Sequence, residues 1–158
     1  MSSNVRGYHS KKEVIANILH YFTMDIVCLQ ETHVTGNSKI KIPGFYSFAK
    51  NRPNAGSKGG VAILVREILK DSAVLIHESK DSEMIAVKFC CFKPNLVVIN
   101  YYARQENITP ANVISDHLSE IFSLTERLTT EGNMVIAAGD WNVSVGAEVL
   151  TDNCPDLS

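Results

Sequence analysis

The sequence lacks long runs of apolar residues. Its longest uninterrupted runs, such as residues 134–138, contain about five residues, whereas a helix that crosses a membrane needs about 20. Residues 1–12 also lack the apolar core that a signal peptide requires. These absences argue against a membrane-spanning helix, and we expect an intracellular protein with no membrane partner.

Cysteine is scarce, and the charge is nearly balanced. The four cysteines, Cys28, Cys90, Cys91 and Cys154, show no Cys-x-x-Cys spacing. Three of them lie in apolar, strand-like runs, where buried free thiols are expected. The 15 basic and 17 acidic residues argue against a strongly basic protein that coats phosphates. Any contact with nucleic acid would therefore use a local site.

The apolar content is sufficient for one folded domain. The chain has 158 residues, of which 45% are hydrophobic, and a domain typically has about 100–200 residues. A disordered chain would have fewer apolar residues and a net charge larger in magnitude than −2. We find no internal repeat, low-complexity tract or linker. We therefore interpret residues 1–158 as one domain or part of one.

The apolar patterns predict a protein of the α/β or α+β class. A capping box that starts at Ser10 precedes a predicted helix over residues 11–22. A second predicted helix has Thr109 as its N-cap and ends near Gly132. Short apolar runs predict strands at residues 25–30, 45–48, 60–65, 84–91, 96–101 and 134–138.

Polar residues follow several of these strands at the point where each strand ends. Glu31 and Tyr102 each follow a buried strand, Asp140 and Asn142 follow the last one, and Asn4 follows a short segment that would form another. In sheet proteins with helical layers, ligands collect beyond the carboxyl ends of the strands. Two carboxylates at such a place suit Mg²⁺, which could neutralise a phosphodiester.

Each of these residues also has a structural interpretation. A carboxylate just past a strand is often the first solvated residue or a helix N-cap, and this applies to Glu31 and Asp140 taken singly. Tyr102 fits a half-buried strand tyrosine, Asn4 fits a turn residue, and Trp141 fits packing against the sheet. The residues alone leave both interpretations open.

Four short motifs occur in a fixed order along the chain. They are Asn-Val-Arg-Gly at residues 4–7, Leu-Gln-Glu-Thr at 29–32, Asn-Tyr-Tyr-Ala at 100–103 and Gly-Asp-Trp-Asn at 139–142. Together they resemble the motifs of the endonuclease/exonuclease/phosphatase superfamily, which has the DNase I-like fold and includes exonuclease III and apurinic endonucleases. The Gln-Glu-Thr-His form and the glycine-rich segment 59–64 are most similar to the endonuclease domains of LINE-type retrotransposons.

The resemblance implies a role for each residue at the strand ends. Glu31 would coordinate a divalent metal with Asn4 beside it, and the metal would be Mg²⁺, with Mn²⁺ as the alternative. Asp140 would position or activate the attacking water, and Asn142 would form a hydrogen bond to the scissile phosphate. Tyr102 would orient that phosphate or stabilise the transition state.

Two further residues are candidate substrate contacts. His33 lies two positions after Glu31 and belongs to the Gln-Glu-Thr-His form. Arg104 stands where the family has a proline after the alanine of the tyrosine motif. Its side chain is either solvated or supplies a cation near the phosphate.

The chain also departs from the family pattern. The family's domain continues past Gly-Asp-x-Asn into a second half, which contributes the second sheet and a Ser-Asp-His motif whose histidine is essential for cleavage. The last residue of the sequence is Ser158, and no such motif precedes it. We therefore expect residues 1–158 to represent mainly the N-terminal half of a DNase I-like four-layer α/β sandwich, with one sheet face uncovered and with weak or no activity.

Three functions follow from this resemblance. The first is a Mg²⁺-dependent endonuclease that nicks target DNA and leaves a 3′-hydroxyl, acting in the nucleus if the element is a retrotransposon. The second is a phosphatase or phosphodiesterase of the same superfamily that acts on phosphoinositides or sphingolipids. The third is a non-catalytic remnant that associates with itself or a partner through its uncovered sheet face.

Overall fold

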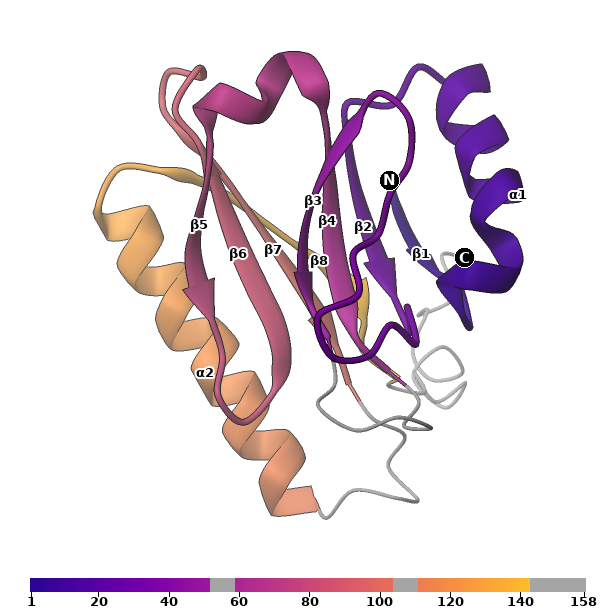
Figure 1. The fold of residues 1–158 in the computed structure, drawn as a ribbon. Helices are drawn as coiled ribbons and strands as arrows, with labels where there is room; N and C mark the ends of the chain where they lie inside the picture. Colours follow the sequence, from indigo (N-terminus) through magenta and orange to yellow (C-terminus); the bar gives the residue numbers. More distant parts are fainter. Residues whose placement is uncertain (52–58, 104–110, 143–158) are drawn as a thin grey trace, which may run out of the picture.

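The fold is a sandwich of two sheets between two helices. The structure is a computed structural model that describes residues 1–51, 59–103 and 111–142. In this part of the chain, eight strands form two four-stranded sheets that face each other. One long helix lies on the outer surface of each sheet (Figure 1). In the described ranges, no helix is both long enough and apolar enough to cross a membrane.

The first sheet has the strand order β1-β2-β4-β3. It consists of β1 (Ser2–Asn4), β2 (Ile26–Gln30), β4 (Val61–Arg66) and β3 (Phe45–Lys50). The strand β1 is parallel to β2, and the other neighbouring pairs are antiparallel. Since β1 and β2 run in the same direction, their carboxyl ends meet at one edge of the sheet.

The second sheet has the order β5-β6-β7-β8. It consists of β5 (Ala73–Glu78), β6 (Glu83–Phe89), β7 (Leu96–Tyr102) and β8 (Met134–Asp140), and the 3₁₀ helix η1 (Glu67–Ser72) leads into it from the first sheet. The last two strands, β7 and β8, are parallel. Their carboxyl ends therefore also meet, at Tyr102 and Asp140.

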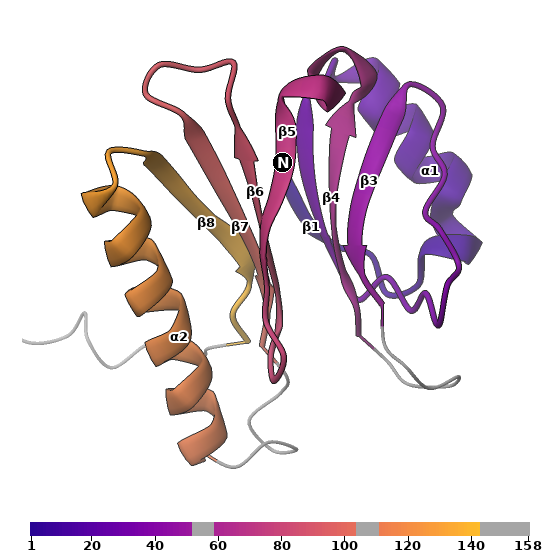
Figure 2. The same cartoon turned by 60° about the vertical axis from the view of Figure 1, so that its left-hand side comes forward.

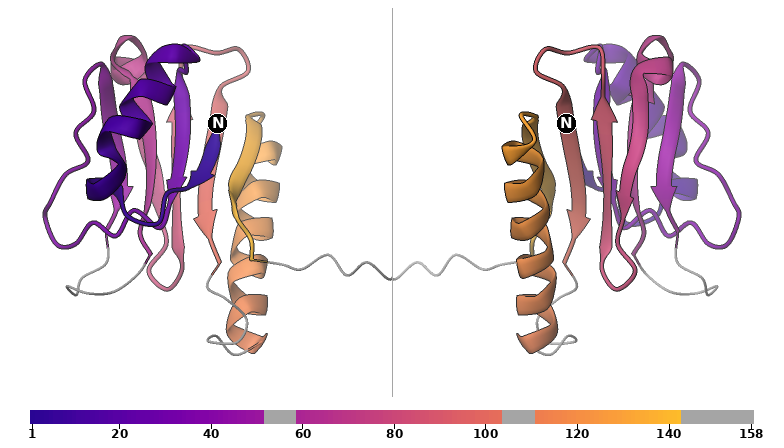
Figure 3. Two further views of the ribbon diagram at one scale, coloured as in Figure 1. Left: turned by 90° about the vertical axis from the view of Figure 1, so that its right-hand side faces the viewer. Right: turned by 90° about the vertical axis from the view of Figure 1, so that its left-hand side faces the viewer.

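Each helix covers one outer face through apolar residues at helical spacing. The helix α1 (Tyr8–Tyr21) packs on the first sheet, and α2 (Ala111–Thr130) packs on the second. Figures 2 and 3 show the four layers with a helix on each outside surface. The buried helical residues are Tyr8, Ile15 and Leu19 in α1, and Ile121, Leu124 and Leu128 in α2.

The central strands are buried on both faces, which explains their continuous apolar runs. In β4, Ile63 faces the second sheet, whereas the neighbouring Leu64 packs toward α1. In β6, Ile85 faces the first sheet, whereas Met84 packs toward α2. All four side chains are almost fully buried. Successive side chains of one strand point to opposite faces of the sheet, so each strand contributes to two hydrophobic cores.

The predicted four-layer sandwich is confirmed, but the expected origin of its second sheet is wrong, while Met134 and Ile136 of β8 remain about half exposed. We expected the second sheet to come from the second half of the family's domain. Instead, β5 to β8 form it from residues 73–140, and its inner face packs against β4. The sequence pattern of β5 was missed because its pairing with β6 shifts register between Leu75 and His77, which disrupts the two-residue period of a strand.

The start of the first helix and two cysteines also differ from prediction. The helix α1 begins at Tyr8, because Ser10 donates to the carbonyl of Gly7 rather than capping a helix that starts after it. Cys28 is buried as expected, but Cys90 and Cys91 are exposed, since β6 ends before them at Phe89. The predicted N-cap Thr109 and the fourth cysteine, Cys154, lie outside the described residues.

Candidate active site

Four strand ends from the two sheets converge on one side of the sandwich (Figure 1). The strand β1 ends at Asn4, β7 at Tyr102 and β8 at Asp140, and Glu31 directly follows β2. The edge strands β1 and β8 are in contact across the sandwich. Residues that are far apart in the sequence therefore share one place in the structure.

The side chain of Asn4 joins two carboxylates from different sheets. Its amide nitrogen donates to Glu31 Oε1 at 2.6 Å and to Asp140 Oδ2 at 2.8 Å. Its oxygen accepts a hydrogen bond from the backbone N–H of Arg6 at 3.2 Å, which fixes the orientation of the amide. Glu31 and Asp140 therefore belong to one site, rather than to opposite sides of the molecule.

Glu31 is held in its charged form. Burial alone would raise the pKa of this carboxyl group, but hydrogen bonds from Asn4 and Tyr102 and the nearby ring of His33 outweigh burial and lower the pKa. Its side chain is 15% exposed, and its Oε2 lies 3.4 Å from His33 Nε2. A partly buried carboxylate that remains ionised is suited to binding a cation.

Tyr102 is a hydrogen-bond donor in this site. Its hydroxyl donates to Glu31 Oε1 at 3.0 Å. Burial, together with the hydrogen bond to Glu31 and the charges of nearby carboxylates, raises the pKa of Tyr102 to about 12. The hydroxyl therefore keeps its proton at neutral pH, so it can donate a hydrogen bond but cannot act as a base.

The backbone is strained where the site residues stand. Glu31, His33 and Asn142 have φ angles of 51°, 53° and 46°, in the left-handed region that costs a residue other than glycine about 1–3 kcal/mol. The first of these turns is held by backbone hydrogen bonds from Gly7 to the carbonyl of Glu31 at 2.8 Å and from His33 to the carbonyl of Gly59 at 2.8 Å. Such strain is typical of functional sites.

Asp140 is oriented by hydrogen bonds to both of its oxygens. Asn4 binds Oδ2, and the backbone N–H of Asn142 donates to Oδ1 at 3.1 Å. The side-chain amide of Asn142 donates to the carbonyl of Ala103 at 2.5 Å. Asn142 thus lies at the site, but its amide nitrogen would have to exchange this partner to reach a phosphate.

Two buried amides beneath the site connect the sheets, and the sequence motifs gave them no role. Gln30 donates to Asn100 Oδ1 at 2.7 Å, and Asn100 donates to the carbonyls of Leu29 at 3.0 Å and Ala62 at 2.8 Å. Both side chains are almost fully buried. A buried side-chain amide needs a hydrogen-bond partner. The presence of an amide within each of two apolar runs is the sequence feature that could have indicated the pairing of Gln30 with Asn100.

Gly139 and Trp141 have structural roles in the last motif. A Cβ atom on Gly139 would lie 2.0 Å from the carbonyl oxygen of Tyr101, so no other residue fits without moving β8. The Trp141 ring packs on Tyr101 with centroids 5.3 Å apart, as the packing interpretation predicts. Arg104 lies outside the described residues.

A second polar cluster contains serine, histidine and glutamate but lacks the geometry of a catalytic triad. Glu120 of α2 accepts hydrogen bonds from Ser79 at 2.9 Å and Ser82 at 3.0 Å, and lies 3.1 Å from His77 Nε2. In a triad the histidine would instead bind the serine hydroxyl. This cluster fastens the β5–β6 turn to α2.

The donor set of the strand-end site fits a hard divalent cation. The two carboxylates match Mg²⁺, which usually binds one or two carboxylates and keeps several waters. The amide of Asn4 would have to turn over to add its oxygen, because its nitrogen faces both carboxylates and its oxygen accepts from Arg6. A cavity of about 500 Å³ lies beside Asn4 and Asp140. In the described part of the chain, no three histidine, cysteine or acidic residues gather as a metal cluster, so any metal here would rely on few protein ligands.

Comparison with known proteins identifies the family. The model of the endonuclease/exonuclease/phosphatase family matches residues 1–156. The chain belongs to this family. The resemblance drawn from the four motifs is therefore confirmed.

Relatives of this family member are found among mobile elements. The chain is 25% identical over 141 residues to the RNA-directed DNA polymerase from mobile element jockey of Drosophila melanogaster, a match that covers 88% of this chain and 14% of the relative. It is 24% identical to the probable RNA-directed DNA polymerase from transposon BS of the same species, with the same coverage. The chain thus spans about one seventh of the length of these relatives.

Solved structures show the same family fold. An AP endonuclease from Archaeoglobus fulgidus aligns over 92% of this chain and 58% of its own length, with a TM-score of 0.61 and 21% identity. The endonuclease domain of TRAS1, a telomere-specific non-LTR retrotransposon, aligns over 90% of this chain and 58% of its own length, with a TM-score of 0.60 and 18% identity. The DNase I-like architecture of this family member is therefore confirmed.

Proposed function

We propose that this chain forms the metal- and phosphate-binding part of a DNA endonuclease from a retrotransposon-like element. The enzyme would hydrolyse a phosphodiester bond and leave a nick with a 3′-hydroxyl. One observation carries this proposal: Asn4 holds Glu31 and Asp140, from two different sheets, in a single site. Family membership and the similarity to the polymerase of mobile element jockey support it.

In this proposal, each side chain at the strand ends has one task. Glu31 would hold Mg²⁺, with Mn²⁺ as the alternative. Asn4 would join it as a ligand only after its amide turns over, since its nitrogen donates to Glu31 and its oxygen accepts from Arg6. The metal ion would supply Lewis-acid neutralisation of the phosphodiester charge. Asp140, fixed by two hydrogen bonds, would orient the attacking water and accept its proton.

The remaining residues would bind the phosphate. Tyr102, whose raised pKa keeps its hydroxyl protonated, would donate to a phosphate oxygen as negative charge develops there. Asn142 and His33 border the same site and would contact the substrate. Among the described residues, the one histidine at the site is paired with Glu31 rather than with Asp140. Since a positioned acid or base contributes about 10²–10⁴ in rate, we expect slow cleavage.

Plasmid nicking tests this function. Supercoiled DNA incubated with the protein and Mg²⁺ should convert slowly to open circles, and EDTA should stop the conversion. Glu31→Gln and Asp140→Asn should each lower the rate by about 100-fold or more, whereas Glu131→Gln, at an exposed position after α2, should not change it.

Two results would contradict the proposal. Nicking that persists in EDTA, or that Glu31→Gln does not affect, would remove the metal site from the reaction. Release of phosphate from phosphoinositides or cleavage of sphingolipids, without nicking of DNA, would favour the phosphatase or phosphodiesterase function of the same superfamily.

A further inference from the structure

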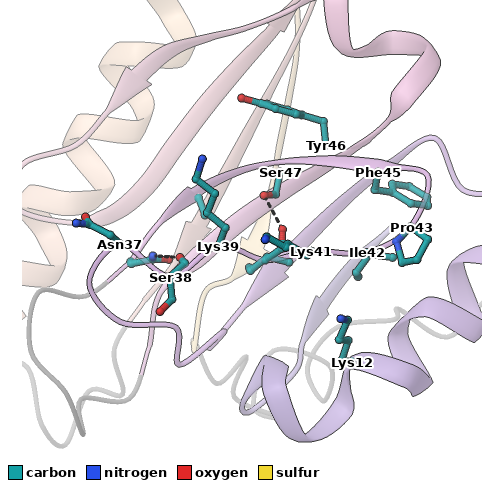
Figure 4. Close-up of a pocket in the computed structure, with 13 residues that line it drawn as sticks. Lys12, Asn37, Ser38, Lys39, Lys41, Ile42, Pro43, Phe45, Tyr46 and Ser47 are labelled. Carbon is teal, nitrogen blue, oxygen red and sulfur yellow. Dashed lines mark hydrogen bonds between the residues drawn. The ribbon is translucent and has the colours of Figure 1, made fainter.

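A large cavity lies on the flank of the first sheet, away from the strand-end site. It has a volume of about 800 Å³ and is lined by α1, β3 and the segment that connects β2 to β3. Figure 4 shows Lys12 on α1 and Lys39 and Lys41 on the connecting segment. We call this the lysine pocket.

The charge around the lysine pocket has one sign. Lys12, Lys39 and Lys41 line it, and no aspartate or glutamate does. In the described part of the chain, none of these three lysines forms an ion pair. A chain with a net charge of −2 therefore has a local concentration of unpaired positive charge at this pocket, which favours an anionic ligand.

The segment that carries two of the lysines is held in place by hydrogen bonds. The Lys41 backbone exchanges bonds with the hydroxyl of Tyr8, which donates at 2.7 Å and accepts at 3.0 Å. Asn51 donates to the carbonyls of Gly36 at 2.9 Å and Ser38 at 2.8 Å. The backbone positions of the lysines are therefore set before a ligand binds, which lowers the entropy cost of binding.

One segment of the chain links the lysine pocket to the strand-end site. The same segment begins at Glu31 and His33, and Lys39 follows His33 by six positions. Six residues span at most about 20 Å. Because phosphates of a duplex strand are spaced about 3.4 Å along the helix axis, this reach corresponds to at most about six base pairs.

We propose that Lys12, Lys39 and Lys41 bind the phosphodiester backbone of the DNA duplex beside the cleavage point. This inference rests on the proposed nuclease function and adds the surface that holds the duplex. Contacts to phosphates position a protein without reading the base sequence. The pocket would therefore strengthen binding to every duplex by a similar factor.

The test measures how DNA binding depends on salt, by fluorescence anisotropy with a labelled duplex in the presence of EDTA. Lys39→Gln combined with Lys41→Gln should weaken binding by about tenfold and reduce the salt slope by about 2, because each lost phosphate contact lowers the slope by about 1. The matched control combines Lys88→Gln and Lys93→Gln, at the far end of β6 and in the turn after it, and should bind like the wild type. Thermal unfolding checks that all proteins are folded.

The outcomes separate this inference from the proposed function. A salt slope that is the same in the Lys39/Lys41 variant and the wild type overturns the lysine pocket, whatever the nicking result. A wild type that does not bind the duplex, or lysine-dependent binding only to vesicles of anionic phospholipid, also overturns it. Failure of the proposed function is observed independently, as the absence of metal-dependent nicking by the wild type.

Discussion

Asn4 and Asp140 are 136 positions apart in the sequence, yet the amide nitrogen of Asn4 lies 2.8 Å from an oxygen of Asp140. The two residues end the edge strands of different sheets, and the same nitrogen also binds Glu31. The candidate site therefore forms only when the two sheets are docked in the right register. Its geometry is a property of the sandwich, rather than of one local segment.

Replacing Asn4 by alanine should destabilise the fold. The variant loses two hydrogen bonds to carboxylates and leaves Glu31 and Asp140 facing each other without the shared amide. We expect the free energy of unfolding in urea to fall by about 1–3 kcal/mol. The control Asn17→Ala, at an exposed position of α1, should change it by less than about 0.5 kcal/mol. Equal effects of the two substitutions would contradict the bridging role.

The buried amides Gln30 and Asn100 should act as a unit. Asn100→Ala leaves the carbonyls of Leu29 and Ala62 without their donor, so we expect a loss of about 2–4 kcal/mol in unfolding free energy. Since Gln30 also loses its partner in this variant, adding Gln30→Ala should cost less than it does in the wild type. A double-mutant cycle measured by urea unfolding checks this, and strictly additive effects would show that the two amides are independent.

Gly139→Ala should be far more damaging than alanine at another glycine with positive φ. At Gly139 the new Cβ atom would overlap the carbonyl of Tyr101, whereas at Gly132, with φ of 80°, no atom lies within 4 Å. We expect Gly132→Ala to cost about 1–2 kcal/mol through backbone strain alone. Gly139→Ala should cost about 1–3 kcal/mol more, because β8 must move away from β7. Similar melting temperatures for the two variants would contradict this view.

Stability should fall with rising pH between about 10 and 12. Burial raises the pKa of Tyr101 and Tyr102 to about 12, whereas an unfolded tyrosine titrates near pH 10. In this window the folded state binds more protons than the unfolded state, so each of these tyrosines lowers stability by up to about 1.4 kcal/mol per pH unit. Below pH 10 these two tyrosines are protonated in both states and add no slope. Burial also raises the pKa of the Cys28 thiol to about 12, so its part of the decline begins at a lower pH, near the thiol's ordinary pKa.

Tyrosine variants test this alkaline transition. Tyr102→Phe should make the decline less steep in unfolding experiments across this range. Tyr21→Phe, at a position that is 80% exposed, is the matched control and should leave the decline unchanged. Tyrosinate absorbance gives a second measurement, because Tyr101 and Tyr102 should titrate near pH 12 in the folded protein. If Tyr102→Phe removes absorbance amplitude near pH 10 rather than near pH 12, Tyr102 is not a late-titrating residue.

Strands that are buried on both faces could be predicted from the sequence within a few residues. The apolar runs of β2, β4, β6 and β7 are continuous because each side of the strand meets a core. The run of β8 is also apolar, although its residues are exposed or half-buried. The strand β5 could not be found in this way, because it is an edge strand with an irregular register and several exposed apolar residues. The first helix was predicted to start too late because Tyr8, which is buried, precedes the apparent capping residue Ser10.

The sequence indicated which residues stand at the strand ends, but not how they interact. Positions such as Glu31 and Asp140 follow from the ends of apolar runs, since the polar residue comes directly after the strand. The bridge through Asn4 depends on how two sheets dock, and no local pattern encodes that docking. The same holds for His33, whose contact with Glu31 requires the left-handed turn at both residues.

The hydrogen bond between Gln30 and Asn100 ties the geometry of the site to the distance between the two sheets. Both amides lie next to residues of the site in the sequence. Gln30 directly precedes Glu31, and Asn100 stands two positions before Tyr102. A substitution in the inner core that slides one sheet against the other would displace Glu31 relative to Tyr102. Mutations far from the strand ends can thus change the distances within the site without contacting it. Substitutions that restore these distances should be sought on the opposite sheet.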